Sequence, residues 1–144
     1  MNKAQQIAIE PCGFFRRLAA IVYDAAVVTA LLMLATALAL LAGFQDQTAL
    51  RDAGYTLYLL AVWAAYIVGC WHVGGMTLGM RAWRLRVLDE RDQPPGWSAS
   101  IVRFLTSLLS AAVFGMGFFW SLANPEKRTW HDLLSRTRLV RQRR

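Results

Sequence analysis

The chain has 144 residues, 56% of them hydrophobic, and a formal net charge of +7. This length allows one domain, residues 1–144, and the long uninterrupted apolar runs exclude an ordinary soluble protein and indicate an integral membrane protein of the all-α class. The basic residues lie between and after the apolar runs without a recognition motif, so we expect no nucleic-acid partner and expect contact with anionic lipid headgroups instead.

The first apolar run covers about residues 17–43 and follows a short N-terminal segment of mixed composition. From Leu18 to Phe44, Asp24 is the only residue that is charged at neutral pH. A helix of this length, rising about 1.5 Å per residue, spans a bilayer core of roughly 30 Å. The run is longer than the apolar region of a signal peptide, so we expect it to remain as a transmembrane helix.

A carboxylate inside such a helix is costly, on the order of 2.5–3.5 kcal/mol, and usually has a partner. Arg17 precedes Asp24 by seven residues, so both side chains lie on one face of the helix, two turns apart. We therefore predict a buried Arg17–Asp24 pair. The pair is either a site for a cation or proton or a static ion pair that orients the helix, and the residues leave both readings open.

The second apolar run covers about residues 54–73 and is long enough for a second transmembrane helix. The alternation of apolar and basic residues from Arg81 to Leu88 predicts a short strand. Residues 89–96 form a turn or loop. A second strand over Thr137–Val140 is available to pair with the first, so we expect a small two-strand element in the cytosol.

The third apolar segment, about residues 101–123, is long enough to cross once, but Gly115-Met116-Gly117 would also allow two half-helices. With three full spans, the basic residues are divided almost evenly between the two sides. With a re-entrant or broken third segment, and Arg103 set aside, 14 basic residues lie on one side and only Arg51 on the other. Because positive charge marks the cytosolic side, we favour this second arrangement, with both termini and the basic tail 124–144 in the cytosol.

Arg103 lies about one turn into the third segment, in a helix that we expect Ser98 or Ser100 to cap. Its side chain either reaches the membrane interface or acts as a second cation that shares Asp24 or Asp132.

Near the C-terminus, Thr129 and Asp132 have the spacing of a capping box that closes the start of a short helix. In a functional reading, His131 and Asp132 lie at a cytosolic mouth, where the imidazole relays protons near neutral pH. The two readings are compatible with each other.

Other site chemistry is absent from the sequence. Cys12 and Cys70 are far apart and form no CxxC motif, which indicates reduced structural thiols. The sequence contains no metal-ligand spacing, no nucleophile with its base and no glycine-rich phosphate loop. We therefore expect no metal, no cofactor and no enzymatic activity.

Three ordered segments resemble the RDD family of small bacterial membrane proteins, which is named for one arginine and two aspartates. The resemblance covers about residues 13–140, and it departs from many members at Met80, where they have lysine. It implies that Arg17 and Asp24 are the arginine and first aspartate of the name and Asp132 the second. The segments that carry it are Gly13–Asp24, then Gly75–Arg81 with its Gly75-x-Thr77-x-Gly79 pattern, and then Trp130–Thr137.

The resemblance implies transport of undefined ligands, and links some members to sodium or potassium/proton antiport. Our leading hypothesis is a small transporter of the bacterial inner membrane, with monovalent cation/proton exchange as the expected activity. Asp24 would bind the cation or proton, and Arg17 would tune the pKa of Asp24 or compete for its carboxylate. Arg103 and Asp132 would form a cytosolic gate. Because two or three helices make a thin wall, we expect a homo-oligomer. The alternative is a non-transporting membrane module that binds a protein partner or anionic lipid, with structural charged residues.

Overall fold

The computed structural model describes residues 9–44, 51–113, 116, 119–120 and 128–142. Its two longest helices are α1 (Phe14–Leu41, 28 residues) and α2 (Ala53–Gly74, 22 residues). At 1.5 Å per residue they are about 42 and 33 Å long. Both are long and apolar enough to cross a membrane, and their ends agree with the predicted runs to within three residues.

Local interactions fix where α2 begins and ends and how it meets α1. The Asp52 carboxylate caps its first turn by accepting from the backbone N–H of Tyr55 at 3.1 Å. Tyr55 Oη also donates to Thr36 Oγ1 of α1 at 2.7 Å, which joins the two helices near their connecting loop. The helix ends at Gly75, whose φ of 67° suits glycine. A Cβ at this position would lie 2.5 Å from the Val87 carbonyl oxygen, so only glycine fits.

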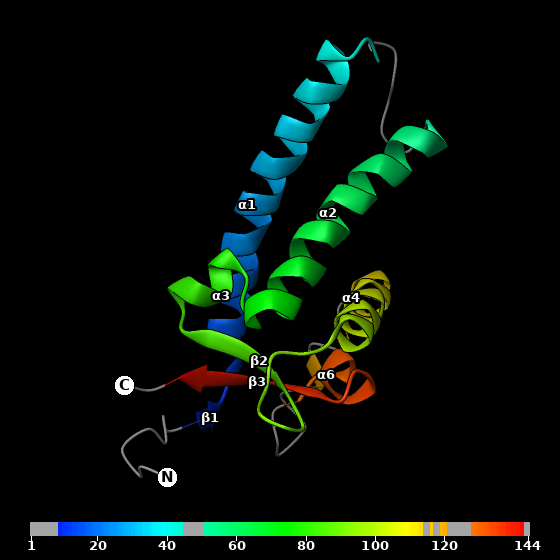
Figure 1. The fold of residues 1–144 in the computed structure, drawn as a ribbon. Helices are drawn as coiled ribbons and strands as arrows, with labels where there is room; N and C mark the ends of the chain where they lie inside the picture. Colours follow the sequence, from blue (N-terminus) through cyan, green and yellow to red (C-terminus); the bar gives the residue numbers. More distant parts are fainter. Residues whose placement is uncertain (1–8, 45–50, 114–115, 117–118, 121–127, 143–144) are drawn as a thin grey trace.

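Three strands form an antiparallel sheet at one end of the two long helices (Figure 1). They are β1 (Ile9–Pro11), β2 (Leu85–Asp89) and β3 (Thr137–Gln142), in the order β1-β3-β2. The predicted pairing of two strands is confirmed as β2 with β3, and β1 adds a third strand that was not predicted. β1 has three residues and no readable alternation, and its place depends on backbone pairing with the edge of β3.

The first predicted strand also began too early, because Arg81 and Ala82 belong to a short helix, α3 (Leu78–Ala82). A second short helix, α6 (Trp130–Leu134), precedes β3 in the same way. Each of these helices is capped by a threonine, Thr77 or Thr129, whose hydroxyl accepts from a backbone N–H three residues later.

The units α3–β2 and α6–β3 repeat one pattern. An arginine with positive φ joins each helix to its strand: Arg84 at 55° and Arg136 at 51°. The antiparallel register sets Val87 opposite Leu139, which occupy equivalent positions 52 residues apart. An approximate two-fold axis through this pair therefore relates β2 to β3. The two capped helices, α3 and α6, precede their strands at opposite ends of the strand pair.

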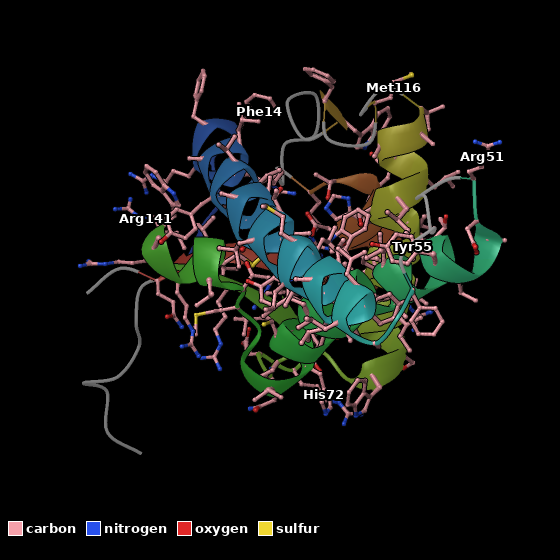
Figure 2. The ribbon with its side chains drawn as sticks, turned by 90° about the horizontal axis from the view of Figure 1, so that it is seen from above. Phe14, Arg51, Tyr55, His72, Met116 and Arg141 are labelled. Atoms are coloured by element: carbon pink, nitrogen blue, oxygen red, sulfur yellow. The ribbon has the colours of Figure 1, made fainter. Side chains whose placement is uncertain are left out.

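The third apolar segment begins as α4 (Trp97–Ala112, 16 residues). At about 24 Å it is shorter than a bilayer core of roughly 30 Å. Figure 1 shows α4 nearly end-on beside α2, and Figure 2 shows it running from near His72 towards Met116, so α4 lies across the long helices. The His72 ring stacks on Trp97 with centroids 4.3 Å apart.

The helix begins after Gly96 without a side-chain cap, so the prediction of a Ser98 or Ser100 cap was wrong. The expected break at Gly115-Met116-Gly117 falls mostly outside the described residues.

The buried core lies where the sheet meets α1, α2 and α4. Both cysteines are free thiols, and Cys12 is part of this core. Its other buried members come from three helices and two strands: Ala20, Ile67, Val68, Trp71, Leu85, Val87, Phe104 and Leu139.

Candidate functional site

The predicted site residues of α1 lie on one side of the helix, but the structure gives them different partners from the predicted ones. Arg17 forms an ion pair with Asp132, at 2.9 Å between Nη1 and Oδ2. Asp24 accepts hydrogen bonds from Thr77 and Gly79 instead. The predicted Arg17–Asp24 pair is therefore corrected: spacing along one helix showed that they share a face, and distant segments that cover this face supply the partners.

The Asp132 carboxylate is fully buried and is shared by two guanidinium groups. Arg103 donates to one carboxylate oxygen and Arg17 to the other. Arg17 Nη1 also donates to Thr129 Oγ1 at 3.1 Å, and the Thr129 backbone N–H donates to Asp132 Oδ2 at 3.0 Å. Thr129 and Asp132 thus form the predicted capping box. We call Arg17, Arg103 and Asp132 the buried triad.

Arg103 connects the buried triad to the sheet and to α2. Its Nη1 donates to Thr137 Oγ1 of β3 at 2.7 Å. Its guanidinium carbon lies 5.1 Å from the ring centroid of Trp71, a cation–π contact. Of its two predicted readings, the structure supports the shared cation on Asp132, because the Arg103 side chain is only 2% exposed and does not reach the interface.

Electrostatics keep Asp132 ionised. Burial raises the pKa of Asp132, but the positive charges of Arg103 and Arg17 outweigh burial and hold this pKa well below its ordinary value. Removing one partner from a buried ion pair costs roughly 3–5 kcal/mol, because the remaining charge is left uncompensated. The buried triad is therefore a structural connection among α1, α4 and α6.

His131 is buried next to the buried triad and is neutral. Burial, followed by the positive charge of Arg103, lowers the pKa of His131 to about 3. An imidazole with this pKa does not change its charge near neutral pH, which argues against the predicted role as a proton relay.

Asp24 connects α1 to α3. Its carboxylate accepts from the Thr77 hydroxyl, from the Gly79 backbone N–H at 2.8 Å, and more distantly from Tyr66 Oη at 3.5 Å. Gly79 packs so closely on α1 that a Cβ there would lie 2.8 Å from Asp24 Cγ and would also overlap the Ala20 carbonyl oxygen. The sequence marked Thr77 and Gly79 only as motif residues, and their contact with Asp24 was not predicted.

An elongated cavity of about 480 Å³ lies between α1, α2 and α4, and we call it the inter-helix cavity. Along α1 its lining extends from Arg17 to Leu32, fifteen positions further along the helix, which is about 22 Å. Arg17, Arg103 and His131 line one end, while the lining farther along α1 and α4 is mainly apolar, including Val28, Leu32, Leu108 and Ala111. The cavity thus has a charged end and an apolar end.

Metal chemistry has no support among the described residues, where no group of three His, Cys, Asp or Glu side chains is arranged to hold an ion. The site residues that sequence reasoning missed are Trp71, Thr137 and Tyr66, which contact predicted residues from other elements. Their sequence spacing gave no signal, because each contact joins segments far apart in the chain.

We predict that Gly79→Ala destabilises the fold by about 1–3 kcal/mol, because the added methyl group overlaps the α1 backbone and the Asp24 carboxyl. Gly69→Ala in α2 is the matched control. A Cβ there meets nothing within 4 Å, so this variant should be neutral or slightly stabilising. Thermal unfolding in detergent micelles measures both, and equal midpoints for the two variants would contradict the close packing of α3 on α1.

We also predict that stability falls as the pH is lowered from 7 to 4. The folded-state pKa of His131 is about 3 and the unfolded value about 6.5, so the unfolded state takes up the proton first. Each pH unit below 6.5 should remove up to about 1.4 kcal/mol. Chemical denaturation at several pH values gives the free energy of unfolding as a function of pH. This free energy should fall less steeply with decreasing pH in His131→Gln than in wild type, whereas the control His72→Gln should behave as wild type does. An equally steep fall in wild type and His131→Gln would contradict the buried neutral imidazole.

Comparison with known proteins supports the resemblance seen in the sequence. The RDD family matches residues 11–136, which is most of the chain and includes Arg17, Asp24 and Asp132. No curated protein and no solved structure matches the chain. With the family motifs on α1, α3 and α6 now seen in contact, the match over residues 11–136 shows that this chain is a member of the RDD family.

Proposed function

We propose that the protein is a multi-pass module of the bacterial inner membrane that binds one amphiphile, such as a lipid, in the inter-helix cavity. The observation that carries this proposal is the gradient along the cavity, from Arg17 and Arg103 at one end to Leu32 and Ala111 at the other. An amphiphile has the same division into a polar and an apolar part. A cavity of this kind should therefore bind an amphiphile better than it binds a bare ion or a fully apolar molecule.

The orientation that we propose has the sheet and both termini in the cytosol. β1 and β3 are neighbours in the sheet, so the two ends of the described chain lie on the same side. Along the sequence, with Arg103 set aside, fourteen basic residues precede the first apolar run, lie between the second and third or follow the third, and only Arg51 lies between the first and second. The exposed apolar side chains of α4, which include Ile101, Leu105 and Leu109, suit a helix that lies in the interfacial layer of the membrane.

Binding of an amphiphile agrees better with the site chemistry than binding of a cation. A cation needs oxygen ligands with lone pairs turned towards it. The carboxylate of Asp24 already accepts from Thr77, Gly79 and Tyr66, and that of Asp132 accepts from two arginines. We therefore propose that both aspartates are structural, as in the alternative reading of the sequence.

The proposal predicts that filling the cavity prevents lipid binding. Ala25 lines the inter-helix cavity and Ala26 does not, and both are exposed positions of α1. Native mass spectrometry of the protein in a neutral detergent should show bound lipid for wild type and Ala26→Phe, and at least a tenfold loss for Ala25→Phe, because the added ring occupies the site. Equal lipid occupancy in Ala25→Phe and Ala26→Phe would contradict the proposal.

Transport of a monovalent cation in exchange for protons is the second candidate function. The observation that favours it is the position of Asp24 in the wall of the same cavity. Because three helices leave this wall thin, a transporting form would be a homo-oligomer.

If the protein transports, ion-dependent proton flux in proteoliposomes should be lost in Asp24→Asn and kept in Asp92→Asn, which changes an exposed aspartate. If Asp24 is structural, wild type should give no flux above empty vesicles, and Asp24→Asn should lower the unfolding midpoint. Equal flux in wild type and Asp24→Asn would exclude the exchange mechanism.

A further inference from the structure

We infer that the charged end of the inter-helix cavity binds the oxyanion headgroup of an amphiphile, held between the indole N–H of Trp71 and the Nε–H of Arg103. This inference rests on the proposed function and adds the chemistry of the ligand's polar end. A carboxylate and a phosphate monoester share the chemistry required.

The first donor belongs to Trp71, which lies near the sheet end of α2. Its side chain is only 6% exposed, and its Nε1 has no hydrogen-bond partner among the described residues. Trp71 lines the cavity. Because an indole N–H can only donate, this buried group requires an acceptor, and buried donors in folded proteins nearly always have one.

The second donor is the Nε–H of Arg103. The Nη1 atom of this arginine is used by Asp132 and Thr137, whereas its Nε is buried without a partner in the described part of the chain. Arg103 also lines the cavity, with its guanidinium carbon 5.1 Å from the centroid of the Trp71 ring. Two neighbouring residues of the cavity lining thus each carry a buried N–H donor that has no partner in the described part of the chain.

Two donors beside a positive charge select a ligand that only accepts and carries negative charge. A carboxylate or phosphate monoester meets this requirement, and an alcohol or an ammonium group does not. The other charged group of the cavity wall, Asp24, lies about 10 Å farther along α1 than Arg17, and its repulsion of an anion favours a headgroup at the Trp71 end. The acyl chain then extends past Val28 towards Leu32.

The test compares four probes by native mass spectrometry of the protein in a neutral maltoside detergent: dodecanoate, dodecyl phosphate, dodecanol and inorganic phosphate. We expect both anionic amphiphiles to bind at least tenfold more tightly than dodecanol, and inorganic phosphate to bind more weakly than either. Equal affinity for dodecanol and dodecanoate would overturn the headgroup assignment. Binding of inorganic phosphate as tight as that of dodecyl phosphate would overturn the amphiphile and indicate a site for free anions.

A matched pair of variants tests the residue assignment. Trp71→Phe keeps an aromatic ring on Arg103 but removes the donor, and should reduce the preference for dodecanoate over dodecanol about tenfold. Trp63→Phe, on the same helix and in the same cavity wall, should leave the preference unchanged. Equal preferences in Trp71→Phe and wild type would refute the assignment. The comparison of probes on wild type needs no variant, so a misfolded variant does not prevent the test.

Failure of this inference and failure of the proposed function give different results. If the cavity binds amphiphiles without reading the headgroup, all three dodecyl probes bind equally and all are lost in Ala25→Phe. If the cavity binds no amphiphile, Ala25→Phe and Ala26→Phe behave alike towards every probe. The first result overturns the headgroup assignment alone, and the second overturns both.

Discussion

The buried carboxylate of Asp132, shared by Arg17 and Arg103, is the contact on which the arrangement of this protein depends. The three residues come from α1, α4 and α6, so segments 115 residues apart meet at one point. None of these charges can be left alone in the interior, because an unpaired buried charge costs several kcal/mol. The contact therefore sets where α4 crosses the long helices and where α6 directs β3 into the sheet. Arg17 and Arg103 of this contact also line one end of the inter-helix cavity.

A second contact, between Asp24 of α1 and the start of α3, resembles the contact of Arg17 with α6, but the α1 residue is acidic and not basic. Thr77 contacts Asp24 through its hydroxyl, and Thr129 contacts Arg17 through its hydroxyl. Each threonine caps a five-residue helix that leads through an arginine of positive φ into a strand. The single helix α1 thus holds two similar helix–strand units, one through Asp24 and one through Arg17, and the pairing of β2 with β3 completes the arrangement.

The sequence predicted those features that depend on local patterns. The apolar runs predicted α1 and α2, and the spacing of Thr129 and Asp132 predicted the cap of α6. Pairing across the chain was not predictable in the same way. Seven-residue spacing shows that Arg17 and Asp24 share a helical face, but it contains no information about which distant segments cover that face. The three-residue strand β1 and the donor of Trp71 also depend on long-range packing, so one sequence gave no signal for them.

The two attachments of α1 have a mechanical consequence. They are separated by about 10 Å along one face of the helix, so a rotation or an axial shift of α1 would break both at once. A movement that widened the inter-helix cavity and kept both attachments would therefore have to displace a wall other than α1. α4 carries a single charged residue, Arg103, and this anchor lies in the first half of the helix. The part of α4 that follows Arg103 contains no charged residue, so no charged side chain of this part holds it to α1 in the way that Asp24 and Arg17 hold α3 and α6.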